Sequence, residues 1–193
     1  MAQDTGRPLR ADAQRNRDKI LAAAVRVFTE EGLDAHYERV AKVAGVGTGT
    51  LYRNFPTRET LIEAAYRNEV ARLCDAVPGL LETLPAREAL RTWMGHFIDY
   101  ATAKLGMAEA LRSVVASGGD PYGHSREMIQ TAITTLMEAG VAAGALRRDI
   151  LPSDLFAALA GIALTSAEPA QRDQAERLLT LTLDGLSAAP SHG

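Results

Sequence analysis

The sequence predicts an all-α protein of about nine helices. Apolar residues recur at spacings of three and four along most of its 193 residues, as they do on the buried face of an α-helix. No segment keeps the strict alternation of apolar and polar residues that marks a half-buried strand, and β-branched residues are sparse. With 47% apolar and 23% charged residues, the chain has the composition of a packed globular protein.

The first helix is expected over residues 12–31. Its apolar side chains fall on one stripe, and Gly32 follows as a helix end. That stripe consists of Ile20, Leu21, Ala24, Val25 and Phe28. Residues 1–11 mix Gly, Pro, Asp and Arg without an apolar period, so a flexible arm is expected before the helix. A second, short helix begins near His36 or Tyr37.

Residues 40–55, VAKVAGVGTGTLYRNF, have the pattern of a helix, a tight turn and a second helix. Gly45 stands where a helix end commonly needs a residue with positive φ, and Val46 is an apolar residue inside the turn. Leu51 and Phe55 lie four residues apart and would bury one face of the second helix. The other face carries hydroxyls, an amide and a cation, which suit phosphates and base edges in a DNA major groove. The residues predicted to contact DNA are Gly47, Thr48, Gly49, Thr50, Tyr52, Arg53, Asn54 and Arg58.

These residues belong to a longer pattern, "IA..AGV..GTLY..F" followed by "P..+E.L". It is matched by Val40-Ala41, Ala44-Gly45-Val46, Gly49-Thr50-Leu51-Tyr52 and Phe55, and then by Pro56, Arg58, Glu59 and Leu61. In this pattern the sequence resembles the TetR family of transcriptional regulators over about residues 15–70. Gly47 departs from the family's usual Ser or Thr, and Thr48 from its frequent Lys or Arg. The resemblance therefore implies no particular base preference.

The resemblance implies two parts. An N-terminal three-helix helix-turn-helix domain, residues 12–57, would bind DNA, and a C-terminal helical bundle, residues 78–188, would bind an effector and form the dimer. Helix four, residues 58–77, would connect them, and residues 189–193 would form a tail. Thr57 is expected to cap helix four, which should stop before Pro78. Arg58 at its start suits a phosphate contact, although a solvated surface arginine is the alternative.

The C-terminal part has the apolar periods of a helical bundle, interrupted by a loop signal at Gly118-Gly119-Asp120-Pro121. Helices are expected over residues 87–105, 107–117, 125–143, 152–167 and 169–188. The resemblance implies an effector pocket, and its candidate residues are Trp93, His96, Phe97, Tyr100, Leu111, Val114 and Met128. Residue by residue, ordinary core packing is the better interpretation of Trp93 and Phe97, whereas for the region as a whole the resemblance implies a cavity between the helices.

The last two helices are expected to form the dimer interface. Residues 154–167, DLFAALAGIALTSA, are small and apolar nearly all round, as in a helix buried in its own core or against another copy. In the TetR family the final helix pair forms a four-helix interface. The predicted interface residues are Leu155, Leu159, Ile162, Leu178 and Leu179. A purely monomeric core is the alternative.

Charge is distributed unevenly along the chain, whose formal net charge is −3. Residues 1–55 hold nine Lys and Arg against seven Asp and Glu, whereas residues 56–193 hold twelve against seventeen. The basic excess lies beside the predicted helix-turn-helix, where a phosphate backbone would be contacted. The excess is modest, so it supports the motif without establishing it. The arm, residues 1–11, fits either a disordered leader or a segment that touches DNA.

No metal, cofactor or membrane partner is expected. Cys74 is the only cysteine, which excludes a disulfide framework and a cysteine-based zinc site and fits a reducing cytoplasm. The four histidines, His36, His96, His124 and His192, lack metal-ligand spacing. The N-terminus has no apolar signal core, and no run approaches membrane-spanning length.

The predicted function is a homodimeric, DNA-binding transcriptional regulator that a small apolar or amphipathic molecule releases from a pseudo-palindromic operator. That it is a repressor is implied by the resemblance alone. One alternative is a constitutive DNA-binding dimer without a ligand. A helical enzyme is the other, but Gly47-Thr48-Gly49-Thr50 lacks the strand and lysine of a phosphate loop, and no nucleophile elbow is present. An enzyme is therefore not expected.

Overall fold

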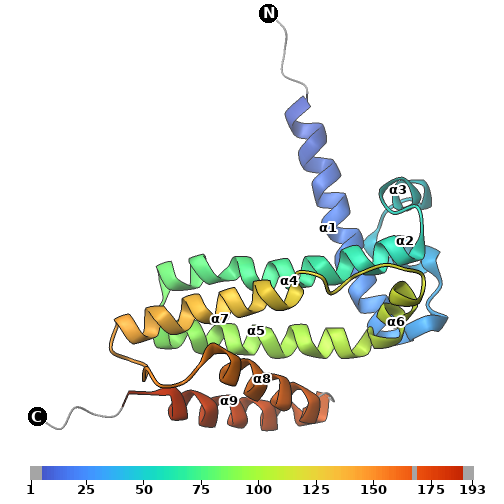
Figure 1. Cartoon of the computed structure of the whole chain (residues 1–193). Helices are drawn as coiled ribbons and strands as arrows, with labels where there is room; N and C mark the ends of the chain where they lie inside the picture. Colours follow the sequence, from blue (N-terminus) through green and yellow to red (C-terminus); the bar gives the residue numbers. More distant parts are fainter. Residues whose placement is uncertain (1–5, 167–168, 189–193) are drawn as a thin grey trace, which may run out of the picture. The chain divides into compact units, whose positions relative to one another are not determined.

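The computed structural model of the chain describes residues 6–166 and 169–188. The elements in these ranges are α1 (Gly6–Glu31), η1 (Gly32–Asp34), α2 (Tyr37–Ala44), α3 (Thr48–Asn54), α4 (Arg58–Thr83), α5 (Ala86–Gly106), α6 (Ala108–Ala116), α7 (Ser125–Ala142), α8 (Pro152–Thr165), η2 (Pro169–Gln171) and α9 (Arg172–Leu186) (Figure 1). A single isolated bridge joins Leu146 to Ser187. The predicted all-α class is confirmed.

The first of two compact units comprises Met1–Asn68 and Gly106–Pro121. In it, α1 packs against α2, α2 against α3, and η1 against α6. Its core side chains are almost inaccessible and come from α1, α2, α3, α4, α6 and the residue after α3: Ile20, Phe28, Val40, Leu51, Phe55, Leu61, Ile62 and Leu111. Each side chain of this size stabilises the fold by about 1.5–3 kcal/mol when buried. This packing holds the short helix α3, which is too short to be stable alone.

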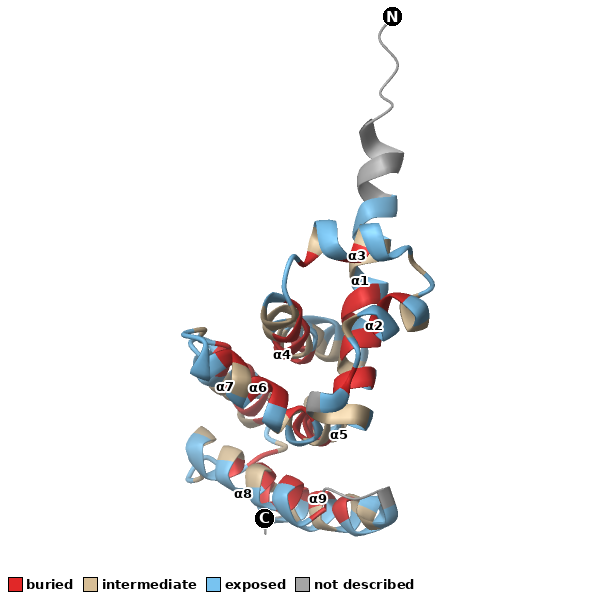
Figure 2. Cartoon of the chain, turned by 90° about the vertical axis from the view of Figure 1, so that its right-hand side faces the viewer, coloured by how far each residue is buried: buried red, intermediate tan, exposed pale blue. Residues whose placement is uncertain are grey.

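The second unit comprises Glu69–Leu105 and Tyr122–Gly193, with α7 packed on α8 and α8 on α9. Its core is centred on the inaccessible side chains of α5: Ala89, Leu90, Trp93, Met94 and Ile98. Figure 2 shows exposed and buried residues alternating along α8 and α9, as expected for helices with one buried face.

Arginine–carboxylate pairs join α5 to α9 in the second unit. Arg87 Nη2 lies 2.7 Å from Asp184 Oδ1, and Arg91 pairs with Glu176. Because these groups are partly exposed, water and salt screen the pairs, and each contributes little on its own. They align the two helices, while the apolar core supplies most of the stability.

Helix α4 does not stop before Pro78, as the sequence predicted, but continues to Thr83. A proline inside a helix removes an N–H donor and costs about 3 kcal/mol. The apolar period nevertheless continues past it: Val77 is buried, and Leu80 and Leu84 are half-buried. Tertiary packing therefore outweighs the local preference of the proline.

Two other helices begin or end away from the predicted residues. Helix α1 begins at Gly6 instead of Asp12, so residues 6–11 of the expected arm are helical, while residues 1–5 and the tail lie outside the described residues. Helix α9 begins at Arg172, after a 3-10 turn, and ends at Leu186. Its end is set by a distant segment, because the Arg147 N–H donates to the Leu186 carbonyl at 3.0 Å.

Candidate functional site

The turn between α2 and α3 has the geometry that its glycine predicts. Helix α2 ends at Gly45, whose φ of 67° and ψ of 33° lie in the left-handed region. Val46 donates its N–H to the Ala41 carbonyl at 3.0 Å, and Gly45 donates to the Lys42 carbonyl at 3.3 Å. These two bonds form a Schellman motif, which satisfies the last carbonyls of α2. The predicted role of Gly45 is confirmed.

Helix α3 turns one face to the core of the first unit and the other to solvent. Leu51 and Phe55 are buried, as their spacing predicted. The residues predicted to contact DNA form the remaining surface: Gly47, Thr48, Gly49, Tyr52 and Arg53 are exposed, and Thr50 and Asn54 are half-buried. One short helix and its N-terminal cap therefore bring seven of the eight predicted residues together.

Hydrogen bonds within α3 orient two of these polar side chains. Arg53 Nε donates to the Gly49 carbonyl at 3.0 Å, and Asn54 Nδ2 donates to the Thr50 carbonyl at 2.8 Å. Asn54 keeps Oδ1 as an acceptor, and Arg53 keeps terminal N–H groups that can reach an anion. These are the donors and acceptors that phosphates and base edges require.

Tyr52 is held by two residues of α2 that the sequence pattern did not single out. Its hydroxyl donates to Glu38 Oε1 at 2.7 Å, and its ring lies edge-on to that of Tyr37, with centroids 5.1 Å apart. The Tyr37 hydroxyl donates in turn to the Phe55 carbonyl. The bond between Tyr52 and Glu38 raises the pKa of the Tyr52 hydroxyl and lowers the pKa of the Glu38 carboxyl. In the sequence, Glu38 shows only as an acid in the first turn of a helix.

The first turn of α4 confirms one prediction and places another residue unexpectedly. Thr60 donates its N–H to Thr57 Oγ1 at 3.2 Å, so Thr57 caps the helix as predicted. Arg58, however, turns inward: its Nη2 donates to the Gly32 carbonyl at 3.0 Å, and its guanidinium carbon lies 5.2 Å from the ring centroid of Phe28. Its Nε is buried and has no hydrogen-bond partner in the described part of the chain. This geometry favours an internal tie between α4 and α1 over a phosphate contact.

Comparison with known proteins shows where this helix-turn-helix belongs. Residues 20–65 match the family described as bacterial regulatory proteins, tetR family, and residues 85–188 match the C-terminal domain of SbtR-like transcriptional regulators. A solved structure of the TetR transcriptional regulator SCO0520 from Streptomyces coelicolor is 75% identical, with a TM-score of 0.88, and covers 90% of this chain and 99% of that chain. The chain belongs to the TetR family.

Two other relatives support the assignment to the TetR family. A TetR regulatory protein from Mycobacterium vanbaalenii is 32% identical, with a TM-score of 0.77, over 94% of this chain and all of that chain (100%). The HTH-type transcriptional repressor AcnR of Corynebacterium diphtheriae is 27% identical over 183 residues, which is 91% of this chain and 94% of AcnR. The protein is therefore a DNA-binding transcriptional regulator, in a family of regulators rather than enzymes.

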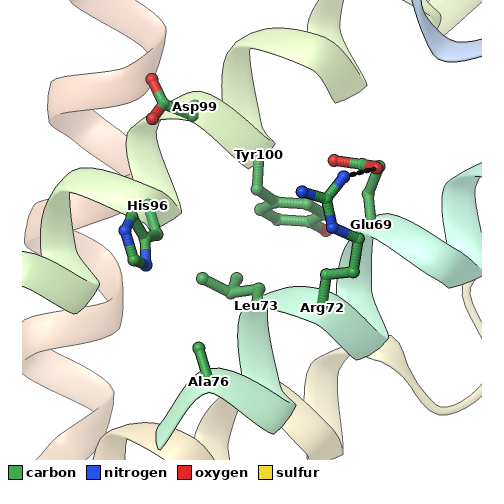
Figure 3. A pocket seen from close by; sticks show the side chains of 7 residues that line it. All are labelled: Glu69, Arg72, Leu73, Ala76, His96, Asp99 and Tyr100. Carbon is green, nitrogen blue, oxygen red and sulfur yellow. Dashed lines mark hydrogen bonds and ion pairs between the residues drawn. The ribbon is translucent and has the colours of Figure 1, made fainter. Parts of the chain in front are cut away.

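The second unit of this TetR-family protein has a hollow of about 300 Å³ between α4 and α5. Figure 3 shows the side chains that line it: Glu69, Arg72, Leu73, Ala76, His96, Asp99 and Tyr100. His96 and Tyr100, two of the residues predicted to anchor an effector, both border it. They lie one helical turn apart on α5, as their spacing requires.

The charged groups around this hollow are largely paired. Arg72 Nη1 lies 3.3 Å from Glu69 Oε1, and Asp99 pairs with Arg172 of α9. Because Asp99 lies on α5, its pair with Arg172 ties α9 to one wall of the hollow. The Arg172 guanidinium also lies 3.5 Å from the carboxylate of Glu176 on its own helix. The side chain of His96 is exposed.

Four other residues predicted for effector binding, Trp93, Phe97, Leu111 and Val114, are buried in the core. Trp93 is inaccessible, its Nε1 donates to the Leu73 carbonyl at 2.9 Å, and its ring lies 5.8 Å from that of Phe97. Leu111 and Val114 are buried in α6, in the first unit. The physical reason is that these large apolar side chains share the helix faces that pack inward, so they fill the interior rather than leave it open.

Met128, the seventh predicted residue, lines a second and more apolar hollow of the same unit. That hollow is about 410 Å³ and lies between α4 and α7. Its lining is Cys74, Val77, Pro78, Glu127, Met128, Thr131, Ala132 and Thr135. Burial raises the pKa of the Cys74 thiol to about 11, so the thiol is neutral at physiological pH. Of the seven residues predicted for effector binding, three therefore border one of two hollows and four lie in the core.

Most residues predicted for the dimer interface are buried within their own protomer. Leu155, Leu159, Ile162 and Leu179 are at most 7% exposed, and Leu178 is half-buried. Their burial places these four side chains in the core of the second unit. The exposed leucines of these helices are Leu164 and Leu181, at 68% and 69%. Near them, a Cβ added at Gly161 or Gly185 would meet nothing within 4 Å.

The described ranges contain no group of three or more His, Cys, Asp and Glu side chains that could hold a metal ion. Within these ranges, none of the helices combines the length and the apolar character that a membrane span requires.

Proposed function

We propose that the protein is a cytoplasmic, homodimeric repressor that binds a pseudo-palindromic operator through α3 of each protomer and is released by a small molecule. The observation that carries the proposal is the exposed polar face of α3, whose opposite, apolar face is buried. Helix α3 lies in the DNA-binding head, by which we mean residues 20–65, the range that matches the TetR family. The name of the relative AcnR, a transcriptional repressor, supports the repressor role.

Selection of genomic DNA fragments with the purified protein tests this proposal. Enriched fragments should share an inverted repeat whose half-sites are centred about 10 base pairs, or a multiple of that, apart. Enrichment of unrelated fragments, with no shared repeat, would count against an operator read by two copies of α3.

At the operator, Tyr52 and Arg53 contact phosphates, and Thr50 and Asn54 meet base edges. Gly47 and Gly49 support close approach of the backbone, because a Cβ at either position would point into open space. Arg53→Ala should therefore weaken binding to all sequences and lower the salt slope by about one contact. Changes at Thr50 or Asn54 should alter base preference.

Arg58→Ala is the matched control, since its guanidinium is held inside the head. A variant with Thr48, Thr50, Tyr52 and Asn54 all replaced by alanine should lose operator binding while it keeps its fold. Normal retardation of operator DNA by that variant would show that α3 is not the recognition helix.

The dimer forms through the outer faces of α8 and α9. Leu164 and Leu181 would meet a second copy of the chain across a two-fold axis, with Gly161 and Gly185 allowing close helix approach. Of the interface residues predicted from the sequence, Leu178 is the one whose exposure supports this role. Sedimentation of the protein without DNA should give a dimer at micromolar concentration.

The effector binds at the hollow between α4 and α5. Its lining combines the apolar Leu73 and Ala76 with His96 and Arg72, which suits an amphipathic molecule with one polar group. Trp93 should report binding by fluorescence, since it donates a hydrogen bond to Leu73, which lines the hollow. His96→Ala should lower effector potency and leave DNA affinity unchanged. An effector whose potency ignored that substitution would place the site elsewhere.

A DNA-binding dimer without an effector is the second candidate function. The packing of Trp93 and Phe97 favours it, because these rings fill the interior where a pocket was expected. The two candidates differ in one measurement: a screen of small molecules against the operator complex should yield a dissociating compound only if the first is correct.

A further inference from the structure

Glu38 places a negative charge beside the surface that α3 presents to DNA. It lies in the first turn of α2 and is exposed. No ion pair neutralises it within the described residues: the neighbouring Arg39 pairs with Glu31, and Arg53 bonds to its own helix. A carboxylate in this position repels phosphates, so its presence in a DNA-binding head needs a reason.

The hydroxyl of Tyr52 is the group that this carboxylate engages. Tyr52 is 45% exposed, and its hydroxyl donates to Glu38 Oε1 at 2.7 Å. A phenol carries one proton to donate, and the oxygens of a phosphodiester only accept. The proton that a phosphate contact needs is therefore already held by Glu38.

Contacts with Tyr37 fix the position of the Tyr52 ring. The Tyr52 hydroxyl therefore donates its proton either to the Glu38 carboxylate or to a phosphate oxygen of DNA. Tyr37 packs edge-on against the ring, and the Tyr37 hydroxyl is itself anchored to the Phe55 carbonyl. The Glu38 carboxylate is in turn favoured by the N-terminal end of the α2 dipole. The pKa of Glu38 is lowered chiefly by the Tyr52 bond, so the carboxylate stays charged while it accepts the proton.

We propose that Glu38 competes with the DNA backbone for Tyr52: it holds the hydroxyl in the free protein, and DNA binding exchanges the carboxylate for a phosphate oxygen. The exchange makes every DNA contact by Tyr52 less favourable, whatever the sequence. Random DNA is then held weakly, and base contacts by α3 decide where the protein binds. This inference rests on the proposed placement of α3 against DNA.

The expected size of the effect follows from counterion release. Each charge at a duplex interface changes the slope of log affinity against log salt by about 0.9. Glu38→Gln keeps the shape and an acceptor but removes the charge, so it should steepen the slope by up to about 0.9. At about 0.1 M salt this corresponds to a gain in affinity of up to about eightfold, and the gain should change by about 3.5-fold between about 50 and about 200 mM salt.

The test is a double-mutant cycle on a random-sequence duplex, measured by fluorescence anisotropy at several salt concentrations. Glu38→Ala should tighten binding in the unchanged protein. In the Tyr52→Phe background the gain should be smaller by about two- to tenfold, the range of one hydrogen bond, because no hydroxyl is released. Glu30→Gln removes a similar exposed charge away from Tyr52 and should leave the slope nearly unchanged. Thermal unfolding verifies that each variant folds.

Three results would overturn the inference. Weaker binding by Glu38→Ala would mean that Glu38 orients Tyr52 for DNA. Equal gains with and without the Tyr52 hydroxyl would mean that charge alone acts. A gain limited to duplexes with one particular base would mean that Glu38 reads that base. In each case the α3 variants still lose DNA binding, whereas failure of the proposed function leaves binding unaffected by any α3 substitution.

Discussion

Replacement of Leu164 and Leu181 by alanine should dissociate the proposed dimer at protein concentrations at which the unchanged protein is expected to stay associated. Both side chains are about two-thirds exposed on a single protomer, at 68% and 69%. They lie on the outer faces of α8 and α9, where Gly161 and Gly185 leave room for another helix. Two-fold symmetry places each leucine in the interface twice, so four leucines would be buried.

The loss can be calculated from this exposure. Full burial of a leucine stabilises by about 1.5–3 kcal/mol, so burying the exposed two-thirds gives about 1–2 kcal/mol per side chain. Four such side chains give about 4–8 kcal/mol, of which alanine retains a minor part. A loss of about 3 kcal/mol or more raises the dissociation constant at least about a hundredfold, since about 1.4 kcal/mol corresponds to tenfold.

Sedimentation velocity over a dilution series measures the dissociation constant, and circular dichroism verifies the fold. Leu151→Ala is the matched control: this leucine is 62% exposed but lies at the N-terminal cap of α8, off the proposed face. Leu179→Ala is the opposite control, because it removes a buried side chain and should lower stability by about 2–5 kcal/mol. An unchanged dissociation constant for the double variant would refute the assignment of this face.

Three further predictions concern the DNA-binding head. Gly45→Ala should lower stability by about 1 kcal/mol, because its φ is 67°, whereas Gly49→Ala, with open space at its Cβ, should be neutral or stabilising in thermal unfolding. Arg58→Ala should lower stability and leave the salt slope of DNA binding unchanged, and a slope lowered by about one would restore its phosphate role. Burial raises the pKa of Tyr37 from 10.0 to about 12, so the folded head keeps a proton that the unfolded chain loses. Stability should therefore be complete below pH 10.0 and fall as pH rises towards about 12, and Tyr37→Phe should remove that fall in urea unfolding.

The helices were predictable because periodicity is a local property, but several of their ends were not. The turn at Gly45 needs a left-handed residue whatever surrounds it, and the sequence supplies one. The continuation of α4 through Pro78 depends on packing of Val77 and Leu80, which no local rule contains. The end of α9 at Leu186 depends on a hydrogen bond from Arg147, nearly forty residues away.

The candidate site likewise has features that the local sequence predicts and features that depend on contacts between helices. The polar face of α3 follows from helical spacing around Leu51, so its members were predictable. The inward turn of Arg58 and the pairing of Glu38 with Tyr52 each join different helices, so only the fold reveals them. For the proposed dimer interface, the sequence pattern selected the most apolar positions of the last two helices. Strongly apolar residues are the ones most often buried inside a single chain, so these positions pack into the protein's own core.

Helix α4 links the DNA-binding and effector proposals. Its residues up to Asn68 belong to the first unit and those from Glu69 onwards to the second, and four of the seven side chains around the hollow come from it. Pro78 has no N–H, so the carbonyl of Cys74 loses its helical donor close to that hollow. A ligand shifts a conformational equilibrium only by its difference in affinity for the two states, typically about 1–3 kcal/mol. A helix with an interrupted hydrogen-bond ladder bends there at lower cost than an intact helix, so an affinity difference of that size is enough to act through α4.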